Sequence, residues 1–136
     1  MAKRYIVDTN VLVRFFTKQP IEQAEKARSL IAAADSGQIK LIILPIIVAE
    51  TIFTLQSFYK MDIKDIGASL KAFLQSYGIE VVEKDILLDA LNDYENGKLG
   101  FVDAYIAASA AANQISIASF DQDFDKIKTI HRHHPN

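Results

Sequence analysis

Short runs of apolar residues alternate with stretches of helical spacing along this chain. Residues 5–7 form an aromatic and β-branched run, and the apolar positions within 11–16 then follow at helical spacing, which predicts a strand, a turn at Asp8 and a helix. Later runs predict further strands at 40–44, 79–82, 115–118 and 128–130. The segments between these runs have helical spacing, so the chain is predicted to alternate between the two kinds of element.

Prolines, glycines and one aspartate mark where the predicted helices begin and end. Pro20 and Pro45 stand where a helix can open, because the first turn does not need the N–H that proline lacks. Gly37 and Gly78 follow apolar stripes and are expected to stop helices. Asp62 is expected to cap the helix that follows it.

The alternation of strands and helices favours right-handed βαβ crossovers and a parallel sheet covered on both faces. The predicted class is therefore α/β. A chain of 136 residues, 50% of them hydrophobic, can bury the core of one compact unit. No linker, repeat or low-complexity segment interrupts the pattern, so we expect a single domain over residues 1–136.

The composition removes several classes of chemistry. The sequence has 0 cysteines, which excludes disulfides, thiolate zinc sites and cysteine nucleophiles. Its 3 histidines, His131, His133 and His134, lie at the end of the chain, where residues are usually mobile, so we expect no histidine base. A net charge of -2 gives no general attraction to nucleic acid. No long apolar span is present, which predicts a soluble, cytoplasmic protein without a membrane segment.

Two aspartates follow predicted strands. Asp8 closes the first strand and Asp121 follows the run at 115–118, and open α/β sheets place ligands at the carboxyl ends of their strands. Each has a plainer interpretation, Asp8 as a helix N-cap and Asp121, with Asp123 and Asp125 close behind, as part of a solvated turn. A calcium-binding EF-hand is excluded, because the required glycine and glutamate are missing from the positions that follow Asp121.

Two further acids belong to predicted helices. Glu50 shares a face with Ile46 and Phe53 in a helix that is apolar nearly all round, where an unpaired carboxylate would be costly to bury. A bound cation would remove that cost, and the alternatives are an arginine partner or an escape to solvent. Asp103 opens an alanine-rich stretch of high helix propensity at 104–112, where it is either an N-cap or a site residue.

A parallel sheet can bring these acids to one rim. Such a cluster repels itself unless something positive binds to it. With no cysteine and no interior histidine, the oxygen ligands favour Mg2+ or Mn2+ over zinc or copper. We therefore expect Asp8, Glu50, Asp103 and Asp121 to hold one or two such ions.

Four segments of the sequence share a pattern with a known family. They are Ile-Val-Asp-Thr-Asn-Val-Leu at 6–12, Ile-Val-Ala-Glu at 47–50, Val-Asp-Ala-Tyr-Ile-Ala-Ala at 102–108 and Ser-Phe-Asp-Gln-Asp-Phe at 119–124. In their order and spacing the chain resembles a PIN domain, and specifically the small bacterial and archaeal toxins of VapC type. The resemblance runs from Tyr5 to Ile130. It implies a three-layer α/β/α fold with a central, mostly parallel sheet, and metal-dependent cleavage of single-stranded RNA.

The resemblance also implies roles for individual residues. The acidic quartet of the family corresponds by position to the four acids named above. The polar neighbours that hold acids and water in place correspond to Asn10 and Ser119, and Asp123 is expected to assist. Ser119 stands where threonine is more usual, and Phe120 precedes the acid, which leaves the number of metal ions open.

The expected mechanism is hydrolysis, in which a divalent ion activates water for in-line attack on phosphorus and neutralises charge on the departing 3′ oxygen. Arg14, one helical turn beyond Asn10, is expected to grip phosphate, with Lys18 or Lys98 as further candidates. The alternative for Arg14 is an ion pair on the helix surface. The choice of RNA over DNA follows from the resemblance alone.

The resemblance implies partners besides the RNA substrate. These are an antitoxin protein, a segment of which lies over the acidic cleft, and a second copy of the chain in a homodimer. Phe53, Phe58 and Tyr59 are candidates for such contacts, and the alternative is that they pack in the core.

Two other kinds of function stay open. A non-catalytic RNA-binding or scaffold protein would retain RNA in EDTA without cutting it. A phosphotransfer enzyme of haloacid-dehalogenase or receiver type would form a phosphoaspartate. An enzyme of haloacid-dehalogenase type needs an aspartate where Asn10 stands. A receiver domain needs a lysine after its last buried strand, where Ser119 stands.

Overall fold

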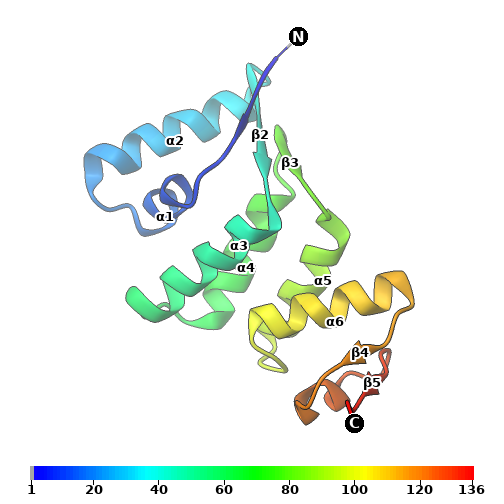
Figure 1. Cartoon of the computed structure of the whole chain (residues 1–136). Coiled ribbons are helices and arrows are strands. Elements are labelled where there is room, and N and C mark those ends of the chain that lie inside the picture. The colour runs from blue at the N-terminus through cyan, green and yellow to red at the C-terminus, as the bar shows by residue number, and fades with distance from the viewer. Residues whose placement is uncertain (1) are drawn as a thin grey trace. The chain divides into compact units, whose positions relative to one another are not determined.

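The computed structural model describes residues 2–136, which divide into two compact units (Figure 1). Unit 1 is Met1–Glu83 and unit 2 is Lys84–Asn136. The boundary falls directly after the third predicted strand. The expectation of one domain over the whole chain stays a prediction.

Unit 1 contains the three-stranded sheet. Its elements are β1 (Lys3–Ile6), α1 (Thr9–Thr17), α2 (Ile21–Asp35), β2 (Ile39–Ile43), α3 (Pro45–Phe53), the π-helix η1 (Thr54–Phe58), α4 (Ile63–Leu74) and β3 (Ile79–Val81). The strands pair in the order β1-β2-β3, all parallel, as they lie in Figure 1. Each crossover between neighbouring strands is helical, as parallel pairing requires.

The strands of this sheet differ in how far they are covered. Leu41 and Ile43 in the central strand β2 are fully buried, as expected for a strand packed on both faces. In the edge strand β1, Tyr5 is 45% exposed and Ile6 is 64% exposed. Cover on both faces was therefore the wrong expectation for β1, because an apolar run in the sequence does not reveal whether its strand is central or at an edge.

The helix boundaries follow from the residues that stand there. Pro45 is the first residue of α3, and the side chain of Asp62 accepts a hydrogen bond of 3.0 Å from the backbone N–H of Lys64, which caps α4. Gly78 has φ +81°, and a Cβ atom there would lie 2.1 Å from the carbonyl oxygen of Ala34. Only glycine fits this close approach between the end of α2 and the entry to β3.

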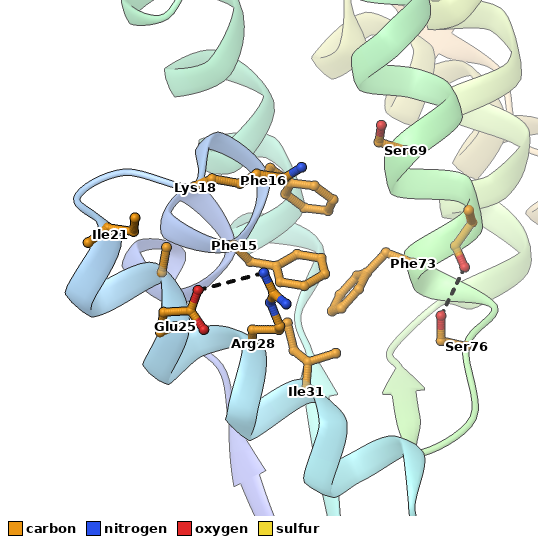
Figure 2. Close-up of a pocket in the computed structure, with 12 residues that line it drawn as sticks. Phe15, Phe16, Lys18, Ile21, Glu25, Arg28, Ile31, Ser69, Phe73 and Ser76 are labelled. Carbon is orange, nitrogen blue, oxygen red and sulfur yellow. Dashed lines mark hydrogen bonds and ion pairs between the residues drawn. The ribbon is translucent and has the colours of Figure 1, made fainter.

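An apolar groove of about 840 Å³ lies between the α1–α2 pair and α4. Figure 2 shows the rings of Phe15 and Phe16 turned toward Phe73, with ring centroids 5.9 and 5.8 Å from that of Phe73. At the rim, Arg28 pairs with Glu25 at 3.7 Å within α2. None of the predicted acids lines this groove.

Unit 2 is built on two packed helices and a small sheet. Its elements are α5 (Lys84–Glu95), α6 (Phe101–Asn113), β4 (Ile117–Ala118), the 3-10 helix η2 (Gln122–Lys126) and β5 (Arg132–His133). The helices α5 and α6 pack together, with the rings of Tyr94 and Phe101 edge to face at 6.2 Å. Tyr94 is 2% exposed, so this aromatic contact belongs to the core.

The last strand differs from the prediction. Residues 128–130 were predicted as a strand, but 128–129 form a turn, and the strand is Arg132–His133, parallel to β4. The guanidinium of Arg132 donates to both carboxylate oxygens of Asp125, at 3.0 and 3.1 Å, and to the carbonyl oxygen of Ser119 at 3.0 Å. These charge-assisted bonds hold the strand through partners that are distant in the sequence.

The predicted class is confirmed: over residues 2–136 the fold is mixed α/β, with six α-helices and a parallel sheet. Across residues 2–136, no helix has both the length and the apolar content needed to cross a membrane.

Candidate active site

Asp8 stands between β1 and α1, at the carboxyl end of its strand. Its backbone has φ -83° and ψ 155°, the extended conformation of an N-cap residue. Its side chain, however, makes no capping hydrogen bond, and the residue is exposed. The capping interpretation therefore describes the backbone position of Asp8 and leaves its carboxylate available to a ligand.

Glu50 is linked to the start of α1. The helices α1 and α3 pack together, and the hydroxyl of Thr9 donates a hydrogen bond to Oε1 of Glu50. Sequence reasoning overlooked Thr9, although it lies between Asp8 and Asn10, where a buried hydroxyl beside acids was a usable signal. Because Thr9 is 6% exposed, its own position is set by packing.

The expectation that Glu50 is buried is wrong. Glu50 is exposed, and its neighbours on the same face, Ile46 and Phe53, are 72% and 69% exposed. The helix is apolar all round, but only the side carrying Val48 and Ile52 packs into the core. Exposure to solvent thus accounts for the carboxylate of Glu50, which needs no cation to offset a cost of burial.

Asp8 and Glu50 line one depression on unit 1. It has a volume of about 540 Å³, and its lining also includes Asn10, Arg14 and Phe58. The Nε of Arg14 donates to the side-chain oxygen of Gln23 at 2.7 Å, so its contact in α2 is with a neutral group. Among the described residues Arg14 forms no ion pair, and its charge is available to an anion in the depression.

The two lysines named as phosphate candidates lie elsewhere. Lys18 lines the apolar groove of Figure 2. Lys98 pairs with Asp93 in unit 2, with Nζ and Oδ1 3.8 Å apart. Neither lines the depression that holds Asp8 and Glu50.

Asp103 belongs to α6 and is not its cap. The helix begins at Phe101, its N-cap is Gly100 with φ -61° and ψ 162°, and Asp103 is in the first turn. Burial raises the pKa of the Asp103 carboxyl, and the negative charges of Asp121 and Asp123 raise it further. Unit 2 therefore brings Asp121 and Asp123 close enough to Asp103 to oppose the ionisation of Asp103.

Asp121 is held by its neighbours in a tight turn. The hydroxyl of Ser119 accepts a hydrogen bond of 2.9 Å from the backbone N–H of Asp121, as expected for a residue that positions this acid. Oδ1 of Asp121 accepts from the backbone N–H of Asp123 at 2.8 Å, which caps η2. Asp123 in turn lies 3.5 Å from Nζ of Lys126, so the turn is ordered by its own hydrogen bonds and charges.

Asp125 has a structural partner that the sequence did not reveal. Arg132 binds both of its carboxylate oxygens, and this hydrogen bonding, with the positive charge behind it, holds the pKa of Asp125 below its ordinary value. Asp125 is exposed, as its interpretation as part of a solvated turn implies, and the ion pair is an addition to that interpretation. The pair anchors η2 to β5 and so supports the turn that carries Asp121.

The donor chemistry of these residues suits a hard divalent cation. Among residues 2–136, no three acidic or histidine side chains gather into a metal-binding group. Each unit nevertheless offers carboxylate oxygens, the ligands that Mg2+ and Mn2+ favour. The mutual repulsion at Asp103 is a charge imbalance that a cation would relieve. That the four predicted acids share one ion stays a prediction.

A comparison with protein families gives a match to the PIN domain over residues 5–130. The chain belongs to the PIN domain family. PIN domains are generally nucleases and generally use divalent metal ions. A search of curated proteins found no match for the chain. The family match covers all four acids and separates the chain from the phosphotransfer folds considered above.

Proposed function

We propose that this protein is an endoribonuclease that cleaves single-stranded RNA with Mg2+ or Mn2+. The observation that carries the proposal is that Asp8 and Glu50, from segments far apart in sequence, line one depression together with Arg14. Carboxylates for a cation beside a guanidinium for an anion are what phosphodiester hydrolysis requires. Membership of a family of nucleases supports the same reaction.

We propose Asp8, Glu50, Asp103 and Asp121 as the residues that hold the ion. When bound, a divalent ion supplies Lewis-acid activation of water and neutralises charge on the phosphate and leaving group. The chain's own groups bind and orient. Arg14 holds a phosphate oxygen, and Thr9 restrains Glu50.

Polar neighbours complete the proposed site. Asn10, exposed beside Asp8, binds water or substrate in the depression. Ser119 fixes the backbone of Asp121, and Asp123 adds negative charge next to Asp103. No histidine base is used.

We further propose that the protein is the toxin of a toxin–antitoxin pair and that it forms a homodimer. The motif resemblance to VapC toxins supports the first part. Exposed large apolar side chains on unit 1, among them Ile46 and Phe53, support contact with other proteins. Ile46 and Phe53, on the face that also carries Glu50, are the residues through which an antitoxin segment would cover the depression.

The test is cleavage of end-labelled, single-stranded RNA and DNA of one sequence, with Mg2+, with Mn2+ and with EDTA. We expect cut RNA with either ion, none with EDTA, and little cutting of DNA. Asp103→Asn is expected to abolish cleavage, whereas Asp35→Asn, at an exposed acid at the end of α2, is the matched control and should cut normally. RNA that binds in EDTA and is never cut would support the non-catalytic alternative instead.

A further inference from the structure

Two aromatic rings stand beside the acids of unit 1. Phe58 ends η1 and Tyr59 follows it, and their ring centroids are 5.0 Å apart with an interplanar angle of 68°. In such an edge-to-face pair, each ring keeps at least one face that the other does not cover. Phe58 is 76% exposed, so a flat apolar surface is open to solvent here.

The backbone that carries these rings is unusual. The N–H of Tyr59 donates to the carbonyl oxygen of Thr54 at 3.2 Å, the five-residue spacing of a π-helix, directly after the regular α3. π-Turns are rare and occur frequently at functional sites. The turn brings Thr54, Phe58 and Tyr59 onto the lining of the depression that holds Asp8 and Glu50.

The depression therefore combines three kinds of group. Asp8 and Glu50 supply carboxylates, Arg14 supplies a guanidinium, and Phe58 and Tyr59 supply aromatic surface. Its volume of about 540 Å³ is in the range of pockets that hold small ligands. A nucleotide presents the matching pair of features, an anionic phosphate and a flat base.

Charge alone does not hold an RNA strand against this surface. The chain has a net charge of -2, and two of the three charged groups that line the depression are negative. Affinity must therefore come in part from an uncharged contact. Stacking of bases on exposed aromatic rings is such a contact, and it tolerates any sequence because every base has a flat face.

We infer that Phe58, backed by Tyr59, is the stacking surface for an unpaired base of the strand whose backbone lies against Asp8 and Glu50. This inference rests on the proposed function and deepens it, because it explains a preference for single strands. Bases in a duplex are already stacked and have no free face to offer. Phe58 is on this account a substrate-binding residue that takes no part in the chemistry.

The test is binding in EDTA, where the strand stays intact, of a short single-stranded RNA that carries the fluorescent base 2-aminopurine. Phe58→Ala is expected to raise the Kd by roughly 5- to 150-fold, the range for losing one base–aromatic stack. Phe58→Trp should bind as well as the parent and quench the fluorescent base. Tyr77→Ala is the matched control, because Tyr77 is an aromatic residue that is 71% exposed and does not line the depression.

Salt separates stacking from phosphate contact. The loss in Phe58→Ala should be the same at low and high salt, whereas the loss in Arg14→Gln should shrink as salt rises, because only ionic contacts are screened. A thermal melt of each variant checks folding, which an exposed ring should hardly affect.

Several results would overturn the inference. One is a Kd for Phe58→Ala close to that of the parent, and another is a loss equal to that in Tyr77→Ala. A third is a change in molar mass by light scattering with no change in Kd, which would make Phe58 a protein contact. If the parent cuts RNA but Phe58→Ala binds RNA as tightly as the parent, the stacking inference fails and the proposed nuclease function stands. If the parent binds RNA through Phe58 but does not cut it with Mn2+, the proposed nuclease function fails and the stacking inference stands.

Discussion

Thr9, the first residue of α1, donates its hydroxyl to a carboxylate oxygen of Glu50 in α3. Thr9 is buried and its position is set by packing, whereas Glu50 is exposed and would otherwise sample several rotamers. Because Thr9 directly follows Asp8, the bond restrains the position of Glu50 relative to Asp8. We regard Thr9 as a positioning residue for the proposed metal site.

Replacing Thr9 by valine keeps the shape of the side chain and removes the bond to Glu50. We expect kcat for RNA cleavage to fall by about 10-fold or more, the usual cost of losing a group that orients a metal ligand, with KM almost unchanged. Thr9→Ser should restore most of the rate. Steady-state kinetics check this. Full activity in the valine variant, with a loss in the serine variant, would show that packing of the methyl group matters instead.

Asp8→Asn should separate activity from folding. Asp8 makes no capping hydrogen bond through its side chain, so the free energy of unfolding should stay within about 0.5 kcal/mol of the parent, as for most surface substitutions. Cleavage should fall by at least about 100-fold, since loss of a ligand costs more than loss of the group that orients it. Urea denaturation and a metal-titrated cleavage assay measure the two. If Asp8→Asn cleaves RNA as fast as the parent across the Mn2+ titration, Asp8 is not part of the site.

Asp103→Asn should stabilise the protein when no divalent ion is present. The pKa of Asp103 is raised in the folded state, so its ionised form at neutral pH opposes folding, and stability falls as the pH rises through that pKa. In EDTA at neutral pH the variant should melt at a higher temperature than the parent, and the difference should close as the pH falls below the pKa of Asp103. A lower melting temperature would mean that the carboxylate stabilises the start of α6.

With a divalent ion present, the parent should melt at a higher temperature than Asp103→Asn. Mn2+ is expected to raise the melting temperature of the parent, because a ligand that binds only the folded state stabilises it, and to leave Asp103→Asn almost unchanged. Ca2+, a cation of equal charge, is the control for general screening. Equal shifts in the parent and the variant would show that the ion binds elsewhere.

The ion pair of Asp125 and Arg132 should make the stability of the protein depend on pH in the acidic range. The pKa of Asp125 is held below its ordinary value of 3.8, so the stabilisation is present at higher pH and is lost as the pH falls through the lowered value. Asp125→Asn should melt below the parent at neutral pH, and the difference should close as the pH falls below about 4. Thermal melts at a series of pH values measure it, and a gap that is constant with pH would exclude this pair as the cause.

Much of the fold could be predicted because single residues impose it. Proline at the start of α3, the capping Asp62 and Gly78 against Ala34 act locally, and their effect is readable without the rest of the chain. The parallel pairing followed from helical crossovers. The short strand β5 was missed, because Arg132 and His133 are held by distant partners and no local pattern marks a strand of 2 residues.

The acids of the candidate site could be predicted from the sequence, whereas their exposure and their neighbouring residues could not. Motif spacing identified Asp8 and Glu50, but the reason given for Glu50 was wrong, since a helix that is apolar all round does not show which of its sides is covered. The helix boundary at Gly100 also moved Asp103 away from the capping position. Phe58 was considered only for protein contacts, because its place in the depression depends on a π-turn that no sequence pattern signals.

The central proposal is that Asp8, Glu50, Asp103 and Asp121 hold the divalent ion that RNA cleavage requires. Its most direct test is the Mn2+ affinity, by calorimetry, of the parent, Asp8→Asn, Asp103→Asn and the double variant, with Asp35→Asn as control. If one ion is shared, each single substitution should abolish most of the binding and the second should add little. Losses that add, or Mn2+ that binds each single variant as tightly as the parent, would contradict a shared ion.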